Sequence, residues 1–156
     1  MESDMNIEKI RNDFPVLKRM VSDREIVYAD SSATALKPVS VNEAVTKYNS
    51  FSTANIHRAK HLLSQEASEA FEDARKIVAR FVSCREHEVI FTSSTTDGIN
   101  LVAQGLGLNS EHNVVGTVLE HHSNILPWSA RCQYRAAPLD ELGLPDLSKA
   151  EKLIDA

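Results

Sequence analysis

The sequence lacks several features that would assign it to a particular class of protein. No stretch approaches the roughly 20 apolar residues that a membrane-spanning helix needs. Residues Met1 to Asp4 are acidic and lack the basic and apolar regions of a signal peptide. The formal net charge of −5 gives no electrostatic basis for binding nucleic acid. We therefore expect a cytoplasmic protein that binds neither a membrane nor nucleic acid.

Cysteine is also scarce. Cys84 and Cys132 lie far apart in the sequence and form no Cys-x-x-Cys pair. This excludes a disulfide framework and a zinc knuckle of the usual spacing. We interpret both cysteines as small core or surface residues.

What remains is a composition typical of a globular protein. The chain has 156 residues, of which 42% are hydrophobic and 25% charged. A chain of about 150 residues can bury roughly two thirds of its unfolded surface, so size alone permits a folded core.

The order of apolar patterns predicts an α/β protein. Strand and helix alternate along the chain, which is typical of a mostly parallel sheet with flanking helices. The longest apolar stripe, from residue 64 to 82, predicts a helix whose apolar face packs in the core. The patterns predict helices at 7–13, 41–48, 64–82, 95–106, 125–134 and from 148, and strands at 89–92, 113–119 and 136–139.

One motif falls where the strand 89–92 gives way to a helix. Ser94 followed by Asp97 is a capping-box arrangement, and Thr95 and Thr96 lie in the first helical turn. The N–H groups of that turn, the helix dipole and the two hydroxyls together form a typical phosphate site. The alternative is an ordinary helix cap that binds nothing.

A second motif, Glu120-His121-His122, follows the strand 113–119. Open α/β sheets bind ligands at the carboxyl ends of their parallel strands, so both motifs are expected at one edge of the sheet. A histidine there could exchange protons near neutral pH, or could be a structural residue at a strand end. A metal-dependent hydrolase built on this motif is disfavoured, because adjacent side chains on a strand point to opposite faces.

His57 and His61 have the spacing of two metal ligands on a helix. Arg58 and Lys60 lie between them and would repel a cation. We predict no metal site.

Five segments together resemble one family in their order and spacing. The resemblance is to the N-terminal part of the group II (Suf-type) cysteine desulfurases, which are pyridoxal 5'-phosphate (PLP) enzymes of the class V aminotransferase superfamily. It extends over residues 8–156, and the segments are Phe14–Leu17, Tyr28–Ala33, Ile56–Ser64, Phe91–Ala103 and Glu120–Trp128.

Three positions depart from the family's usual residues. Ser32 stands where the family has Ala, and Ala59 and Ser94 stand where it has Gly. The loops at residues 59 and 94 are therefore expected to avoid the conformations that only glycine adopts at low cost.

The resemblance implies an incomplete fold type I PLP-transferase large domain preceded by an N-terminal arm. Residues 1–40 would form the arm and a small-domain segment. Residues 41–156 would form the N-terminal portion of the PLP-binding large domain, truncated before the cofactor lysine. In the family, the strand matching 89–92 lies at a distance from the next two, so here it would lack its native neighbour and the chain would need a complementary chain, self-association or a rearranged sheet.

The resemblance also implies roles for individual residues. Thr95 and Thr96 would hold the phosphate of PLP, and His121 would stack on its ring and act as the catalytic residue that moves protons. Ala33, His57 and Arg58 would border the substrate, although a solvated basic loop at 57–58 and a simple turn at Asp30 to Ala33 explain those segments as well.

The implied activity takes sulfur from L-cysteine, forms a persulfide, releases alanine and supplies iron–sulfur cluster assembly. The family's cofactor lysine and sulfur-accepting cysteine come from later sequence, so this chain alone is expected to be inactive. Its expected partners are an L-cysteine-like substrate, a second copy or a complementary C-terminal chain, and a sulfur-acceptor protein. Alternatives are another class V enzyme, such as a selenocysteine lyase or an epimerase-like enzyme, or a non-catalytic fragment that pairs with a full-length subunit.

Overall fold

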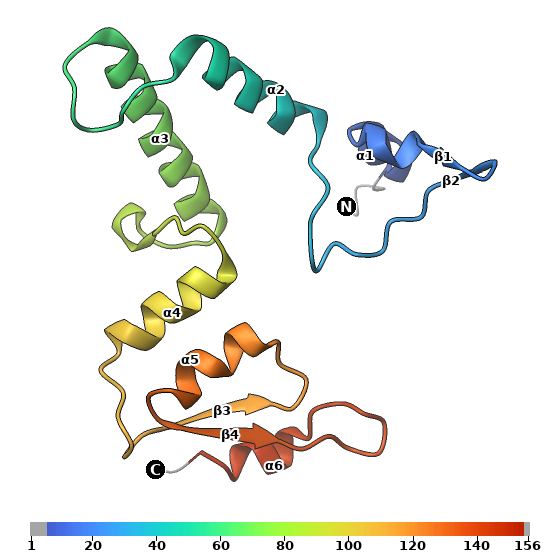
Figure 1. Cartoon of the computed structure of the whole chain (residues 1–156), viewed down its shortest axis with the longest axis vertical. Helices are drawn as coiled ribbons and strands as arrows, with labels where there is room; N and C mark the ends of the chain where they lie inside the picture. Colours follow the sequence, from blue (N-terminus) through green and yellow to red (C-terminus); the bar gives the residue numbers. More distant parts are fainter. Residues whose placement is uncertain (1–5, 155–156) are drawn as a thin grey trace. The chain divides into compact units, whose positions relative to one another are not determined.

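The computed structural model describes residues 6–154, which fall into two units that divide between Val89 and Ile90. Each unit is an assembly of helices, short strands and turns joined by loops (Figure 1). The last residues of the predicted final helix, 155–156, lie outside the described residues.

The first unit begins with a small helical and hairpin segment. Asn6 caps the first helix by accepting a hydrogen bond of 2.9 Å from the Lys9 N–H. The helix ends before Phe14, as predicted from the proline that follows. The elements are α1 (Ile7–Asn12), the 3₁₀ turn η1 (Pro15–Lys18), and the antiparallel strands β1 (Met20–Val21) and β2 (Arg24–Glu25).

The β1–β2 hairpin was not predicted. Its two turn residues, Ser22 and Asp23, have φ angles of 49° and 61°. Positive φ at both turn positions is the geometry that matches the twist of a two-residue hairpin, but the usual Asn-Gly or Asp-Gly signal is absent from the sequence.

Two longer helices complete the first unit. Pro38 precedes α2, as predicted, and the His61 ring caps α3 by accepting a hydrogen bond of 3.3 Å from the Ser64 N–H. α3 spans 20 residues and matches the predicted helix of about five turns. The elements are α2 (Val39–Lys47), the π-helical turn η2 (Tyr48–Ser52), α3 (Leu62–Phe81) and the 3₁₀ turn η3 (Glu86–Glu88).

The second unit is a small α/β arrangement. β3 and β4 pair in parallel with Gly116 opposite Ala136, and the crossover between them contains η4 and α5. Both α5 and α6 pack against β4 (Figure 1). The elements are α4 (Thr95–Gly105), β3 (Asn113–Thr117), the 3₁₀ turn η4 (His122–Asn124), α5 (Leu126–Ser129), β4 (Gln133–Ala137) and α6 (Leu147–Glu151).

Three predictions of secondary structure differ from the structure, one in the existence of a strand and two in the bounds of an element. Residues 89–92 form no strand, because no neighbouring chain in the described part supplies a ladder of hydrogen bonds for them. The predicted helix 125–134 ends at Ser129, and the predicted strand 136–139 begins earlier, at Gln133. Pairing with β3 explains why β4 begins at Gln133, because Asn113 opposite Gln133 starts the ladder.

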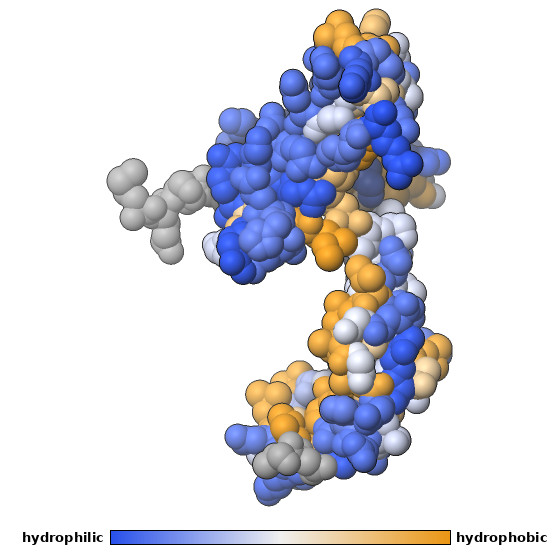
Figure 2. Space-filling view, turned by 90° about the vertical axis from the view of Figure 1, so that its left-hand side faces the viewer, coloured by the Kyte–Doolittle hydropathy of each residue, from blue (hydrophilic) through white to orange (hydrophobic). Residues whose placement is uncertain are grey.

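Many large apolar side chains are exposed, contrary to the prediction that the apolar face of the helix 64–82 packs in a core. Among the apolar residues of α3 only the small Ala67 and Ala79 are buried, whereas Phe81 at the helix end is 88% exposed. Figure 2 shows hydrophobic residues at the surface of the molecule. Core packing of the α3 stripe is therefore seen only at its small residues, and its large side chains have little of the described chain to pack against.

Candidate functional site

The N-terminal turn of α4 is built as the capping-box motif predicts. Ser94 precedes the helix in extended backbone, with φ −166°, and its Oγ accepts a hydrogen bond of 3.1 Å from the Asp97 N–H. A serine adopts this conformation without the cost that a left-handed one would carry. Neither Ser94 nor Ala59 has a positive φ angle, so the two replacements of glycine are accommodated as expected.

The Asp97 carboxylate is turned back toward the loop before the helix. Its Oδ2 accepts hydrogen bonds from the Ser93 N–H at 3.2 Å and the Ser93 Oγ at 3.3 Å. The loop is thereby fastened to the helix that follows. Thr95 and Thr96 are exposed in the first turn, where helix geometry leaves backbone N–H groups without a partner inside the helix.

A polar network lies after the end of β3. Glu120 accepts hydrogen bonds from Asn124 Nδ2 at 2.8 Å and from Thr117 Oγ1 at 3.1 Å. Asn124 in turn accepts one of 3.0 Å from Trp128 Nε1. The hydrogen bond from Asn124, followed by that from Thr117, lowers the pKa of Glu120 below its ordinary value, because both stabilise the carboxylate. The crossover after β3 is thus held by an ionised carboxylate.

His121 has its ring orientation set by Ser123. Its Nδ1 accepts a hydrogen bond of 3.2 Å from the Ser123 N–H and lies 2.8 Å from Ser123 Oγ. A backbone N–H can only donate, so Nδ1 carries no proton and the neutral ring holds its proton on Nε2. The ring is exposed, and Nε2 is the atom that can exchange a proton with a ligand.

An open cavity of about 250 Å³ brings the two predicted motifs together. Thr96 from the first turn of α4 and the neighbouring residues His122 and Ser123 from η4 border it. The remaining lining residues are Asn100, Leu126, Pro127 and Ala130. His121 does not itself line this cavity but precedes the two residues of η4 that do.

The expectation that His121 and His122 point to opposite faces of a strand is wrong. β3 ends at Thr117, and His121 caps η4, of which His122 is the first residue. The two ring centroids are 6.3 Å apart. Across residues 6–154 no cluster of three or more His, Cys, Asp or Glu side chains could hold a metal ion.

The predicted substrate residues belong to the first unit. Ala33 lies in a turn in which its N–H donates to the Asp30 carbonyl at 3.2 Å. His57 has its ring 3.3 Å from the Glu72 carboxylate, measured from Nε2 to Oε1, and Arg58 is exposed beside it. Thr95, Thr96 and His121 all belong to the second unit.

Sequence reasoning missed Ser123 and Asn124, which orient His121 and Glu120. Both contacts lie within four residues of their partners. Ser and Asn two to four residues after a polar residue at a strand end are a recognisable local-turn signal.

Comparison with known families gives a match over most of the chain. The family model for class V aminotransferases matches residues 27–156, and the chain belongs to this family. No described helix is long and apolar enough to cross a membrane.

Curated relatives are named as cysteine desulfurases. A cysteine desulfurase of Cronobacter sakazakii is 38% identical over 159 residues, which cover 96% of this chain and 39% of the relative. A probable cysteine desulfurase of Streptomyces coelicolor is 41% identical over 151 residues, covering 91% of this chain and 36% of the relative. The chain therefore spans about two fifths of the length of these relatives.

Solved structures agree. An apo cysteine desulfurase from Thermococcus onnurineus NA1 matches with a TM-score of 0.81 and 38% identity, covering 97% of this chain and 38% of that chain. The cysteine desulfurase CsdA from Escherichia coli matches with a TM-score of 0.75 and 33% identity, covering 98% of this chain and 39% of that chain. The small parallel sheet with flanking helices is consistent with part of a fold type I PLP enzyme.

Proposed function

We propose that this chain is the N-terminal part of a PLP-dependent cysteine desulfurase of the group II (Suf) type. Its substrate would be L-cysteine, from which sulfur passes to a cysteine thiol as a persulfide with release of alanine, for iron–sulfur cluster assembly in the cytoplasm. The match to proteins named as cysteine desulfurases over nearly the whole chain supports this proposal. The family's cofactor lysine and sulfur-accepting cysteine match no motif of this chain, so we propose that it is inactive alone.

The observation that carries the proposal is the cavity shared by Thr96 and the His122–Ser123 turn. Hydroxyls and backbone N–H groups at a helix N-terminus suit the phosphate of PLP, and we assign that role to Thr95 and Thr96. When bound, PLP supplies an electron sink for bond cleavage at the substrate's carbon atoms.

We assign His121 to stacking and proton transfer at the cofactor ring. Ser123 holds Nδ1 as an acceptor, which leaves the proton of the neutral ring on Nε2. A fixed tautomer places the exchangeable proton at one known atom, as general acid–base catalysis requires. Ala33, His57 and Arg58 are assigned to the border of the substrate pocket.

We propose that the chain works with a second polypeptide: a complementary C-terminal chain or a second copy. Two exposed apolar groups support this: Phe81 at the end of α3 and Ile90, which is 68% exposed. In the described part, β3 and β4 pair only with each other, so each has a further edge. A sulfur-acceptor protein would be a later partner of the assembled enzyme.

The phosphate site is tested by adding PLP to this chain and following Trp128 fluorescence. Trp128 is the only tryptophan of the sequence and directly follows Pro127, which lines the cavity. We expect PLP to quench its emission more strongly than pyridoxal, which lacks the phosphate. Inorganic phosphate should reduce the quenching by PLP and leave the quenching by pyridoxal unchanged. Thr96→Ala should weaken PLP binding at least about tenfold, the lower end of the range for one hydrogen bond to a charged group.

Thr46→Ala is the matched control, because Thr46 is also an exposed helical threonine but lies in α2. It should leave PLP binding unchanged. Equal quenching by PLP and pyridoxal, or equal affinity of the Thr96→Ala variant and the parent chain, would overturn the assignment of the phosphate site.

The need for a second chain is tested by sedimentation and thermal unfolding of the purified polypeptide. We expect self-association or a broad, weakly cooperative transition, because large apolar side chains are exposed. A monodisperse monomer that melts cooperatively would contradict this part of the proposal.

A further inference from the structure

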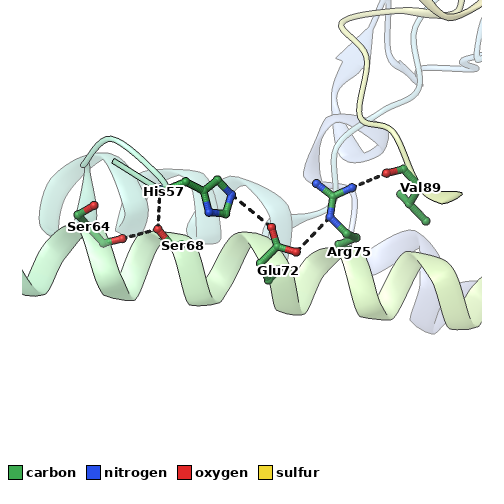
Figure 3. A network of polar contacts seen from close by, with 6 residues as sticks. All are labelled: His57, Ser64, Ser68, Glu72, Arg75 and Val89. Carbon is green, nitrogen blue, oxygen red and sulfur yellow. Dashed lines mark hydrogen bonds and ion pairs between the residues drawn. The ribbon is translucent and has the colours of Figure 1, made fainter. Parts of the chain in front are cut away.

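The turn at His57 has a backbone conformation that a residue with a side chain rarely adopts. Its φ angle is 61°, in the left-handed region. The His57 N–H donates a hydrogen bond of 2.9 Å to Ser68 Oγ on α3, and Ser68 Oγ donates one of 2.6 Å to the Ser64 carbonyl (Figure 3). The turn is thus fastened to the helix through its main chain.

The His57 ring is fastened to the same helix one turn further on. Its Nε2 lies 3.3 Å from Glu72 Oε1, and its edge meets the Phe71 ring with centroids 5.8 Å apart. Glu72 Oε2 also accepts a hydrogen bond of 3.1 Å from Arg75 Nε, and Arg75 Nη1 donates to the Val89 carbonyl (Figure 3). One carboxylate therefore holds both the imidazole and the guanidinium.

The residues that make these contacts share one face of α3. Ser64, Ser68 and Glu72 are spaced four apart, and Arg75 follows three further on. This face contacts the His57 turn at one end and the carbonyl of Val89 at the other. The arrangement leaves the His57 ring directed at the helix, while the adjacent Arg58 side chain is exposed.

We propose that Ser68 and Glu72 are positioning residues for Arg58. They hold His57 in its left-handed conformation, and this fixes the direction in which the next residue presents its guanidinium to an anionic group of the substrate, such as a carboxylate. The inference rests on the proposed function, in which the His57–Arg58 segment borders the substrate pocket. It changes the role of His57 from a substrate contact to a support for Arg58.

The experiment measures amide hydrogen exchange of the chain by NMR, residue by residue. Ser68→Ala removes the acceptor of the His57 N–H, and we expect exchange at His57 to rise about tenfold. Ser68→Thr keeps a hydroxyl at the same position and should restore slow exchange. Glu72→Ala removes the contact to the ring, and exchange at His57 and Arg58 should rise up to about fivefold, the scale of one half-exposed polar contact.

Asp73→Ala is the matched control for Glu72→Ala. Asp73 is the next residue on α3, and its carboxylate pairs with Lys76 at 2.9 Å instead of with the turn. Both changes introduce alanine, the strongest helix former, so α3 amides should keep their exchange rates in every variant.

Faster exchange at His57 and Arg58 in Ser68→Ala and Glu72→Ala, with none in Asp73→Ala, supports the proposal. Unchanged exchange in those two variants, or loss of protection along all of α3, overturns it. The readout needs neither cofactor nor substrate. Its failure is therefore separate from failure of the phosphate site, which the fluorescence test on Thr96 reports.

Discussion

Replacing Gly116 in β3 by alanine should destabilise the second unit through one identified contact. Gly116 faces the ring of Tyr134 on β4, and an added Cβ would overlap Tyr134 Oη and lie 2.8 Å from its Cζ. Ordinary van der Waals contact begins at 3.4 Å, so the ring must move. Tyr134 Oη donates a hydrogen bond of 3.2 Å to the Thr117 carbonyl, which the displaced ring would lose.

The size of the effect follows from three contributions. Overpacking costs about 1–3 kcal/mol, and loss of the hydrogen bond costs about 0.5–1.5 kcal/mol. Alanine regains about 0.5–1 kcal/mol relative to glycine in a strand, because it has less conformational freedom to lose. We expect a net loss of about 0.5–4 kcal/mol in the free energy of unfolding. The half-buried ring can yield toward solvent, which favours the lower part of this range.

The assay is urea unfolding followed by Trp128 fluorescence, with Gly105→Ala as the matched control. An added Cβ at Gly105 meets nothing within 4 Å, and its position in α4 favours alanine, so this variant should be at least as stable as the parent. In a Tyr134→Ala background the cost of Gly116→Ala should vanish. A Gly116→Ala chain as stable as the parent, or one equally destabilised without the Tyr134 ring, would refute the reasoning.

Three further predictions concern caps and carboxylates. Ser94→Ala should lower the stability of α4 by about 1 kcal/mol in a thermal melt, whereas Ser94→Asp should retain the cap. Asn124→Ala should raise the pKa of Glu120 toward its ordinary 4.5, measured by NMR titration, because its strongest hydrogen-bond donor is lost. Hydrogen bonds from Ser148 and then Lys149 lower the pKa of Asp146 from 3.8 to about 2, so its contribution to stability is present above pH 3.8 and lost as the pH falls toward 2. Asp146→Asn should abolish that acid dependence of the urea midpoint, and an unchanged dependence would contradict the assignment.

Local signals in the sequence predicted the elements that depend on local physics. The α4 cap rests on Ser94 and Asp97 three residues apart, and α3 rests on an apolar stripe sustained for about five turns. Both are confirmed, because caps and helical periodicity act within a few residues. The alternation of strand and helix also predicts parallel strands, and β3 and β4 are parallel.

The wrong predictions concern elements whose structure depends on contacts with residues distant in the sequence. The segment 89–92 has the composition of a buried strand, yet a strand exists only where a neighbour completes its hydrogen bonds. The apolar stripe of α3 likewise predicts burial, but burial requires a second surface, and Phe81 is exposed in the described chain. A periodic pattern identifies the face of a helix that can be buried, but it does not identify the surface that buries it.

In the candidate site, too, the sequence predicts the local helix cap but not the residue at which β3 ends. Adjacent histidines point to opposite faces only where they lie on a strand. β3 instead ends at Thr117, whose hydroxyl donates to Glu120 Oε1 and accepts from the Leu119 N–H at 3.2 Å. These bonds turn the chain away from the ladder and allow His121 to cap η4. A threonine followed three residues later by an acidic side chain therefore ends β3 early, and that end brings His122 and Ser123 to the cavity bordered by Thr96.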